Sequence, residues 1–388
     1  MEYINLNELC DINIGKTPSR SKPEYWGEGK KWLAISDLKE KYIYETKEEI
    51  TKLAIEKCNM KMVPKDTVVM SFKLSIGKLG IVKDDMFTNE AIANFKIKNK
   101  SLITKEFLYY ALMTVNFNNT DRAVMGATLN KAKLNTIKIP YFEVRVQDKI
   151  VNTLNKAKEL IDKRKEQIEA LDELVKSKFI EMFGDPIRNN MNWEIKKVGD
   201  IAFVTKLAGF EYTQYINYQD EGEVVVVKGL NVKEKKLKLD NVSYIDKETS
   251  DLLPRSQLKK NDLVMTYVGI NIGDVALVDG KNRYHLAPNV AKISLLKESN
   301  INPVFMVNLL YMSRILFSSG ATSTAKQALN MGRIREIDIM MPPVELQNQF
   351  ADFVKQVDKL KFEMEKSLKE LEDNFNSLMQ RAFNGELF

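Results

Sequence analysis

The chain has 388 residues, of which 44% are hydrophobic and 9% aromatic, as expected for a globular protein with more than one domain. Its 10 prolines and 17 glycines exclude a collagen-like or low-complexity chain, and its 2 cysteines exclude a disulfide framework or a four-cysteine zinc site. A net charge of +6 permits nucleic-acid binding without requiring it. Because no segment approaches about 18 uncharged apolar residues and no signal peptide opens the chain, we expect a soluble, cytoplasmic protein without membrane contact.

The sequence repeats itself at a separation of about 196–200 residues. The order of the matching blocks is the same in both copies, and their separation drifts slowly. The matches are residues 76–82 with 272–278, 92–95 with 290–293, Leu129-Asn130 with Leu329-Asn330, and Gln147 with Gln347. We infer two copies of one unit of roughly 190 residues.

Each copy begins with a predicted α+β domain. Short β-rich runs, such as residues 67–72 and 223–227, are broken by Gly, Asn and Asp turns. A helical segment is then predicted around residues 104–114 in the first copy and 303–316 in the second.

Each copy ends in a predicted long helix. From residue 147 to 183 apolar residues recur at alternating steps of four and three, and residues 346–378 repeat this heptad pattern. Gly184 and Gly385 are typical of residues that end a helix. At about 1.5 Å per residue each helix would be roughly 55 Å long, and its narrow apolar stripe needs a partner.

The expected fold class is α+β, with two tandem α/β domains separated by two long helices that pair as an antiparallel coiled coil with pseudo-two-fold symmetry. Full-length pairing would bring Arg164 near Glu365 and Lys178 near Asp352. The alternative, that the helices pack on unrelated surfaces, stays open. The expected boundaries are residues 1–146 for the first domain, 147–190 for the first helix and linker, 191–344 for the second domain, and 345–388 for the second helix.

No catalytic constellation stands out in the sequence. It contains no G-x-G-x-x-G, H-E-x-x-H, G-x-S-x-G or C-x-x-C motif. The single histidine, His285, lies near Pro288 in a segment that looks like a loop, whereas metal hydrolases and catalytic triads generally need positioned imidazoles. The sequence therefore predicts a binding and scaffolding protein.

Several stretches together resemble the DNA specificity subunits of type I restriction-modification systems, and they span nearly the whole chain. Two resemble different subtypes of the opening of a target recognition domain, two its mid-domain strand and turn, and two the ends of the family's conserved helices. In that order they are residues 14–20 (IGKTPSR, followed by Trp26 and Trp32) and 206–212 (KLAGFEY), 76–82 and 272–278, and 179–186 (FIEMFGDP) and 378–387 (LMQRAFNGEL).

The resemblance implies a non-catalytic subunit of a site-specific nuclease and methyltransferase complex. Each target recognition domain would dock on one half of a split double-stranded DNA site, and the paired helices would set the spacer between the halves. Because the two domains differ, the target is expected to be asymmetric. The implied partners are two modification subunits that methylate adenine at N6 and two restriction subunits. These partners are expected to bind S-adenosylmethionine, ATP and Mg²⁺, while this chain binds no cofactor or metal.

Candidate DNA contacts follow from side-chain chemistry. Lys and Arg bind phosphates or guanine edges, Asn and Gln read adenine, and hydroxyl groups serve either role. The candidates in the first domain are Lys16, Thr17, Ser19, Arg20, Lys73, Lys78, Arg122, Lys131 and Lys133. Those in the second domain are Lys206, Tyr212, Lys228, Asn231, Tyr267, Asn271, Lys326, Gln327 and Arg333.

Two other functions remain compatible with the sequence. One is a structural coiled-coil scaffold with two protein-binding heads, which salt-dependent DNA binding would distinguish from a DNA reader because phosphate contacts weaken steeply with salt. The other is the recognition half of a restriction-methylation enzyme whose catalytic part is a separate chain.

Overall fold

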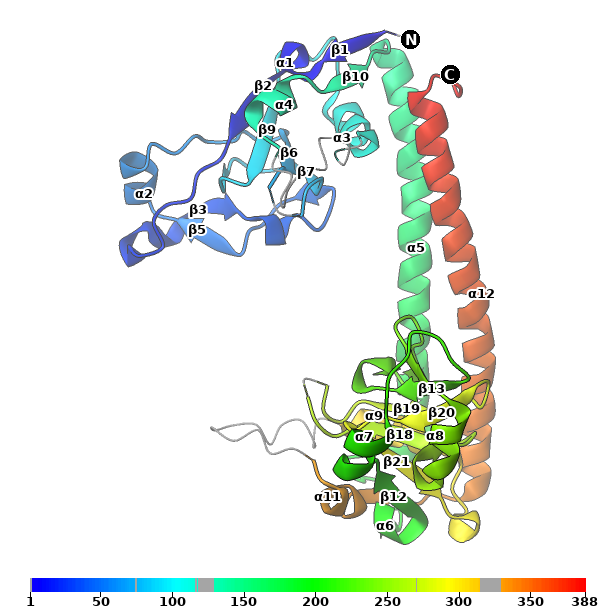
Figure 1. Ribbon diagram of the computed structural model, residues 1–388. Helices are drawn as coiled ribbons and strands as arrows, with labels where there is room; N and C mark the ends of the chain where they lie inside the picture. Colours follow the sequence, from blue (N-terminus) through cyan, green and yellow to red (C-terminus); the bar gives the residue numbers. More distant parts are fainter. Residues whose placement is uncertain (1, 74, 116, 118–128, 270, 315–328) are drawn as a thin grey trace. The chain divides into compact units, whose positions relative to one another are not determined.

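The computed structural model describes residues 2–73, 75–115, 117, 129–269, 271–314 and 329–388. The chain divides into two compact units (Figure 1). Unit 1 comprises Met1–Glu166 and Lys366–Phe388, and unit 2 comprises Gln167–Glu365. Two long helices, α5 (Val144–Phe183) and α12 (Val344–Phe383), each pass from one unit into the other. Each unit therefore combines an α/β part with one segment of α5 and one segment of α12.

The α/β part of unit 1 is built on a sheet with the strand order β2-β9-β6-β7-β4. A smaller sheet has the order β5-β3-β8, and β1 pairs with β10. The elements are β1 (Tyr3–Asn5), α1 (Leu6–Leu9), β2 (Cys10–Ile14), η1 (Pro23–Tyr25), β3 (Trp26–Leu33), η2 (Ile35–Asp37), β4 (Tyr42–Ile43), β5 (Glu48–Ile50), α2 (Lys52–Lys57), β6 (Val68–Ser71), β7 (Leu79–Val82), β8 (Phe87–Thr88), β9 (Ile92–Ile97), α3 (Lys105–Thr114), α4 (Lys131–Asn135) and β10 (Lys138–Pro140).

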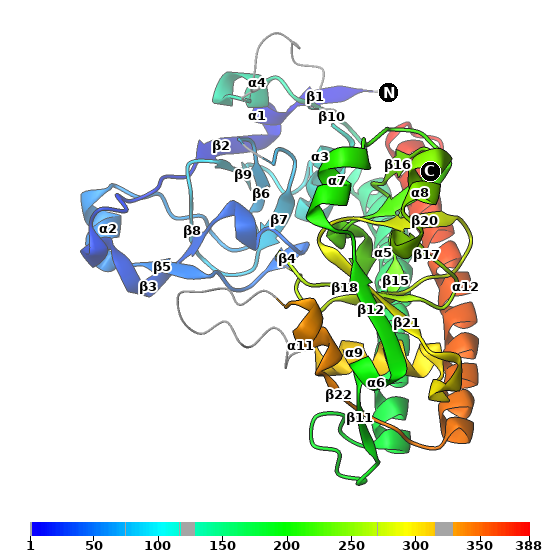
Figure 2. The same ribbon diagram turned by 60° about the horizontal axis from the view of Figure 1, so that its bottom comes forward.

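The α/β part of unit 2 has a main sheet in the order β12-β21-β18-β19 and a second sheet in the order β16-β13-β20-β17 (Figure 2). Its elements are β11 (Ile195–Lys197), α6 (Val198–Ile201), β12 (Ala202–Lys206), α7 (Gly209–Tyr215), β13 (Val224–Val227), η4 (Gly229–Asn231), β14 (Val232–Lys233), β15 (Lys236–Leu237), β16 (Ser243–Ile245), α8 (Lys247–Leu252), η5 (Pro254–Ser256), β17 (Gln257–Leu258), β18 (Leu263–Thr266), β19 (Val275–Leu277), β20 (Arg283–Leu286), β21 (Val290–Leu295), η6 (Lys297–Ser299), α9 (Pro303–Ser313), α11 (Met331–Arg335) and β22 (Asp338–Met340).

The two units share one frame, which confirms the predicted tandem repeat. The antiparallel order β2-β9-β6-β7 of unit 1 recurs as β12-β21-β18-β19 in unit 2, and the β1–β10 pair recurs as β11–β22. The turn before β7 and its counterpart before β19 each contain a glycine, Gly77 and Gly273, with φ at 90°. Each glycine N–H donates to the last residue of the preceding strand, Ser71 or Thr266. Glycine is required there because other residues rarely adopt a positive φ.

The frame also repeats at the level of single hydrogen bonds. Gln147 is buried, accepts from the Thr104 N–H at 3.0 Å and donates to the Phe142 carbonyl at 2.9 Å. Gln347 is also buried, accepts from the Asn302 N–H at 2.8 Å and donates to the carbonyl of Pro342 at 2.8 Å. In both units this glutamine thus joins the start of the long helix to the residue that caps α3 or α9.

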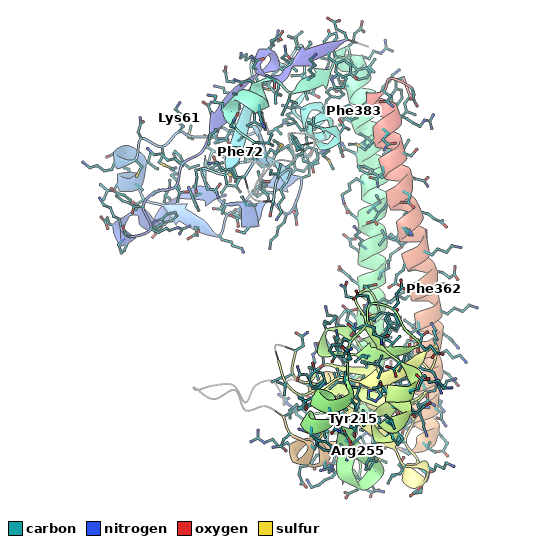
Figure 3. All side chains as sticks on the ribbon, in the orientation of Figure 1. Lys61, Phe72, Tyr215, Arg255, Phe362 and Phe383 are labelled. Atoms are coloured by element: carbon teal, nitrogen blue, oxygen red, sulfur yellow. The ribbon has the colours of Figure 1, made fainter. Side chains whose placement is uncertain are left out.

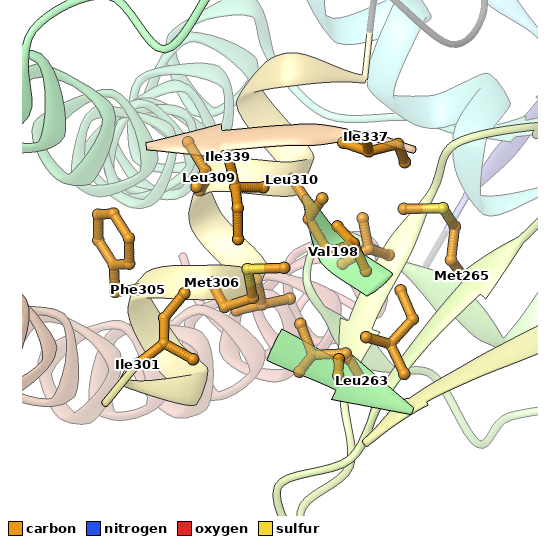
Figure 4. Packing of buried hydrophobic residues seen from close by; sticks show 14 of the residues in the cluster. Val198, Leu263, Met265, Ile301, Phe305, Met306, Leu309, Leu310, Ile337 and Ile339 are labelled. Carbon is orange, nitrogen blue, oxygen red and sulfur yellow. The ribbon is translucent and has the colours of Figure 1, made fainter. Parts of the chain in front are cut away.

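The long helices pair antiparallel within each unit, as predicted. In unit 1, Ile150 and Leu154 near the start of α5 share a core with Phe375 and Phe383 near the end of α12. In unit 2 the end of α5 pairs with the start of α12. The ring centroid of Phe179 on α5 lies 5.4 Å from that of Phe350 on α12. The core of unit 2 continues into α9 and the main sheet, where the side chains in Figure 4 meet.

One of the predicted charge pairs between the helices, Lys178 with Asp352, is wrong. Lys178 forms its ion pair with Glu181 of its own helix at 2.8 Å, and not with Asp352. Two ion pairs that join the helices are Lys165–Glu372 at 2.8 Å in unit 1 and Lys361–Asp172 at 2.6 Å in unit 2. Buried aromatic side chains of both helices also pack together, and such contacts contribute more than exposed ion pairs.

The segment around His285 is also not the loop that the sequence predicted. His285 lies in β20 and is fully buried, because β20 pairs with both β13 and β17. Within the described ranges, no helix is both long and apolar enough to cross a membrane.

Candidate nucleic-acid interface

Four candidate residues of unit 1 meet at one edge of its main sheet. Ile14 ends β2 opposite Ala93, and Ser71 ends β6 opposite Ile92, so both strands end beside the start of β9. Lys16 and Thr17 follow β2, Lys73 follows β6 and Lys78 precedes β7. We call this edge, with its counterpart in unit 2, the loop edge.

Gly15 is needed at the loop edge of unit 1. A Cβ on this residue would lie 2.2 Å from the carbonyl oxygens of Thr88 and Asn89. The neighbouring Lys16 N–H donates to the Thr88 carbonyl at 2.8 Å, so the backbone runs close against the segment before β9. The loop after β2 therefore leaves the sheet along a fixed path.

The rest of this loop is held by side chains. The Arg20 guanidinium donates to both carboxylate oxygens of Glu48, at 2.5 and 2.8 Å, and lies 3.6 Å from the ring centroid of Trp26. This bond holds the pKa of the Glu48 carboxyl below its ordinary value, so the pair stays charged. Trp26 donates to the Ser19 carbonyl at 3.2 Å, and Trp32 donates to the Lys16 carbonyl at 3.1 Å. Both tryptophans pack against the loop.

The side chains of three other candidates in this loop also have partners. The Lys16 ammonium donates to the Cys58 carbonyl at 2.7 Å, the Thr17 hydroxyl donates to the Glu90 carboxylate, and the Ser19 and Ser21 hydroxyls lie 2.8 Å apart. The loop therefore presents ordered cations and hydroxyl groups at the surface of unit 1.

Lys131 and Lys133 lie apart from this loop, on α4, and both are exposed. Lys131 lines a groove of about 490 Å³ together with Lys96 and Lys98, and Asp11 lies on the same groove. The excess of ammonium groups makes this a second positive surface of unit 1. Three further candidates lie outside the described residues: Arg122, Lys326 and Gln327.

The loop edge of unit 2 brings three of its candidates together. Lys206 ends β12, Tyr267 follows β18, and the Lys206 ammonium lies 5.5 Å from the Tyr267 ring centroid. Tyr267 is 7% exposed and its hydroxyl donates to the Pro288 carbonyl, so it supports the edge from below. Asn271 occupies the turn before β19, and its carbonyl accepts the Asp274 N–H at 3.1 Å.

Two candidates flank a turn that follows β13. The Lys228 ammonium donates to the Ser243 hydroxyl at 2.6 Å and lies 4.4 Å from the Tyr218 ring centroid. Asn231 is fully buried, accepts from the Lys228 N–H at 3.0 Å and donates to the carbonyl of Lys238 at 2.9 Å. Its amide thus closes the turn and faces the protein interior.

The role of Asn231 has a counterpart in unit 1 that the sequence reading missed. There the Asp37 carboxylate accepts from the Ala34 N–H at 3.0 Å and closes the corresponding turn. The two residues follow strands of equivalent position, β3 and β13, each of which pairs in parallel with a later strand. A comparison of residues 34–37 with residues 228–231 would have indicated that Asp37 and Asn231 occupy equivalent positions.

Helix α7 gives the loop edge of unit 2 a different surface. Its candidate Tyr212 is half-buried, 5.9 Å from Tyr218, while Phe210 is 66% exposed. The Arg255 guanidinium pairs with Glu211 at 3.1 Å and ties this helix to η5. Figure 3 shows Arg255 and Tyr215 on this part of unit 2. Neither Phe210 nor Arg255 was among the predicted contacts, although an exposed aromatic beside cations suits contact with a base.

The last candidate, Arg333, is exposed on α11, which occupies the place of α4 in the repeat. Asn330 caps α11 by accepting the Arg333 N–H at 2.9 Å, just as Asn130 accepts the Lys133 N–H at 2.9 Å in unit 1. In each unit, therefore, the repeated frame carries a cation on this short helix. The described part of the chain contains no cluster of His, Cys, Asp and Glu that could hold a metal ion.

Comparison with known proteins identifies the family that shares this architecture. The family model of the type I restriction modification DNA specificity domain matches residues 1–170 and 190–373. The chain is 25% identical to the type I restriction enzyme MjaIX specificity subunit of Methanocaldococcus jannaschii, over 98% of this chain and 92% of that protein.

Two solved structures share the fold across nearly the whole length. One comes from work on complex assembly and conformational transition of the type I restriction-modification system, with a TM-score of 0.63, 14% identity, and coverage of 100% of this chain and 98% of the other. The second is the S subunit of a type I restriction-modification system from M. genitalium, with a TM-score of 0.51, 15% identity, and coverage of 98% and 96%. The chain belongs to the family of type I restriction-modification DNA specificity proteins, whose members are specificity subunits and not catalytic ones.

Proposed function

We propose that this chain reads an asymmetric, bipartite double-stranded DNA site with a fixed spacer, one half-site at each loop edge. The observation that carries the proposal is that the two units repeat one frame and differ at the loop edge. A repeated frame offers each unit the same way of approaching a duplex. Different loops offer different side chains to the bases, so the two half-sites differ in sequence.

The charges at the loop edges support contact with DNA. Lys16, Lys73 and Lys78 surround the edge in unit 1, and Lys206 and Lys228 do so in unit 2. Ammonium groups of this kind neutralise phosphates and fix the register of a protein on the duplex, while neighbouring side chains read the bases. Phe210, which is 66% exposed, is suited to an apolar contact with a thymine methyl group.

The long helices support a fixed spacer. Both α5 and α12 run without interruption from one unit into the other. A continuous helix adds about 1.5 Å per residue and resists changes in length, unlike a flexible linker. A site with a spacer of different length would therefore engage only one half at a time.

The outer faces of the helices support docking of partner subunits. They expose apolar side chains that neither unit covers: Leu160 (55%), Leu174 (47%), Leu360 (46%) and Phe362 (64%, labelled in Figure 3). Exposed leucine and phenylalanine side chains on a long helix are compatible with docking of another protein, since interface cores are enriched in apolar and aromatic residues. We assign these faces to two adenine-N6 methyltransferase subunits and propose that two restriction subunits complete the assembly. S-adenosylmethionine, ATP and Mg²⁺ would be held by those partners.

The direct test is to express the chain together with the methyltransferase of the same system and to map N6-methyladenine in the host DNA by single-molecule sequencing. We expect methylation at a split, asymmetric motif with one spacer length, and none when this chain is omitted. A continuous or palindromic motif, or methylation that persists without the chain, would contradict the proposal. Binding of the complex to DNA that does not weaken with salt would instead favour a protein-binding scaffold.

A further inference from the structure

We propose that Lys41 in unit 1 and Lys235, together with its neighbour Lys236, in unit 2 are positioning residues that fix each α/β part on its long-helix segments and thereby decide which spacer the protein accepts. The proposal rests on the proposed function, because spacer choice has a meaning only for a bipartite site. None of these lysines lies at the loop edge, and none was among the predicted DNA contacts.

In unit 1, Lys41 links the segment before β4 to α3 and α5. Its ammonium donates to the Asn155 side-chain oxygen on α5 at 2.6 Å and lies 3.4 Å from the Tyr110 hydroxyl. Tyr110 in turn donates to Asn155 at 2.7 Å. The rings of Tyr110, Tyr109 and Tyr42 surround the ammonium, with centroids at 4.4, 5.3 and 5.3 Å. The charge is thus held by directional contacts to the helix and by aromatic faces.

In unit 2, Lys235 takes the corresponding place in the turn between β14 and β15. Its ammonium lies 5.5 Å from the ring centroid of Tyr311 on α9. Burial lowers the pKa of Lys235, and the nearby carboxylates of Asp172 and Asp358 act in the opposite direction. The adjacent Lys236 forms an ion pair with Asp358 on α12 at 2.7 Å. This turn is therefore joined to α12 by Lys236 and to α9 by Lys235.

The backbone shows that Lys41 and Lys235 are equivalent. The carbonyl of Lys41 accepts the N–H of Ile81 in β7 at 2.7 Å, and that of Lys235 accepts the N–H of Leu277 in β19 at 3.0 Å. Strands β7 and β19 are counterparts in the repeated frame. The same position thus carries a lysine in both units, although its ammonium contacts an amide and a phenol in unit 1 and the Tyr311 ring in unit 2.

A half-buried lysine is costly, which makes its presence in both units informative. Burial lowers the pKa of Lys41 to about 8 and lowers the pKa of Lys235, because the ammonium leaves water. An apolar side chain would fill the same space without this cost, but apolar contacts lack direction and allow the surfaces to slide. The bond from Lys41 to Asn155 in unit 1 and the ion pair between Lys236 and Asp358 in unit 2 favour one orientation of each α/β part on its helices. One orientation in each unit is what a fixed spacer requires.

The test measures spacer choice with the intact complex of this chain and its methyltransferase. Target DNA carries the two half-sites at the native spacer, or with one base pair added or removed, a change of about 3.4 Å. We expect Lys41→Met and Asn155→Leu to lower the preference for the native spacer by about tenfold, the effect of losing one charge-assisted hydrogen bond. Asn155→Asp keeps an acceptor for Lys41 and should keep the preference. In unit 2 the double variant Lys235→Met/Lys236→Met should act like Lys41→Met, because it also removes the ion pair with Asp358.

The matched control is Lys31→Met. Lys31 also lies in unit 1 and pairs with Asp84 at 2.6 Å, but both residues belong to the α/β part, so spacer choice should not change. If Lys41→Met leaves the complex unfolded, Asn155→Leu gives the same reading from the helix side. Variants that fold and keep the native preference would overturn the inference and leave the proposed function standing. Wild-type complex without bipartite methylation would overturn both.

Discussion

The loop edge of unit 1 carries an extended loop, whereas that of unit 2 carries a helix. After β2 the chain runs as a loop that is fixed by the contacts of Arg20 with Glu48 and Trp26. After β12 the chain turns into α7, which is held by the ion pair between Arg255 and Glu211. Both segments stand on the same antiparallel frame. The two units therefore separate two tasks: the repeated residues build the frame, and the residues that differ face solvent at its edge.

The reason for this separation is the cost of burial. A buried polar group must keep its hydrogen bonds, so few residues can replace Gln147 or Gln347 without loss of stability. Side chains at the loop edge are paired with water or with one another, and most substitutions there change stability little. Sequence change at the edge can therefore alter the DNA target while the frame stays intact.

The largest effect on stability is expected from substitutions in the frame that the two units share. Gln147→Ala and Gln347→Ala should each lower the free energy of unfolding by about 2–4 kcal/mol, because each leaves several buried groups without partners. Denaturant unfolding of the purified chain measures this cost. Gln356→Ala, at an exposed position on α12, should change it by less than about 0.5 kcal/mol. A small loss at both buried glutamines would show that the frame does not depend on them.

A smaller effect is expected at the two loop edges. Lys78→Ala in unit 1 and Lys206→Ala in unit 2 should weaken binding of the complex to all DNA sequences alike, a few-fold each. The slope of log affinity against log salt should fall in magnitude by about 0.9 for each lost phosphate contact. Lys176→Ala, on the exposed face of α5, is the matched control and should leave the slope unchanged. An unchanged slope in both edge variants would place the DNA elsewhere on the units.

The smallest expected effect is a pH dependence of stability that distinguishes unit 2 from unit 1. Burial lowers the pKa of His285 below its ordinary value of 6.5, and its Nδ1 donates to the Leu286 carbonyl at 3.1 Å. Below that value the unfolded chain takes up a proton that the folded unit 2 refuses, so unit 2 loses stability as pH falls and keeps it above. Unit 1 contains no histidine.

Hydrogen exchange one pH unit above and one below that value, corrected for the intrinsic rate, measures this difference. The amides of β13 and β20 should lose protection at the lower pH more than those of β6 and β9 do. His285→Gln should remove the difference. Equal losses in both units of the wild-type chain would mean that other groups dominate.

The sequence predicted the features that depend on periodic spacing or on residues repeated in both copies. Heptad spacing gave both long helices, and the matching blocks gave the frame, including the equivalence of Gln147 and Gln347. It failed on the ion pair expected between Lys178 and Asp352, because Lys178 pairs with Glu181 of its own helix. It failed on His285, because pairing of β20 with β13 outweighs the loop signal of nearby Pro288.

The sequence predicted the types of side chain at the candidate site better than it predicted which individual residues are exposed there. Lysines beside the ends of strands were found because they follow recognisable blocks, as Lys16 and Lys78 do. Burial was not visible: Asn231 was taken for a base contact, and Lys41 was missed. In both cases the deciding partners come from distant segments or from the fold of a turn, as with Lys41 and Asn155. Tertiary contacts of this kind leave no local pattern.

The most direct test of the central claim is to alter one loop edge at a time and to read the whole methylated motif. Arg20→Ala releases the loop after β2, and Arg255→Ala releases α7, while the frame stays in place. Mapping N6-methyladenine with each variant complex should show one half of the motif relaxed by Arg20→Ala and the other half relaxed by Arg255→Ala, with the spacer unchanged in both. Relaxation of the same half by both variants, or of both halves by either one, would contradict the assignment of one half-site to each unit.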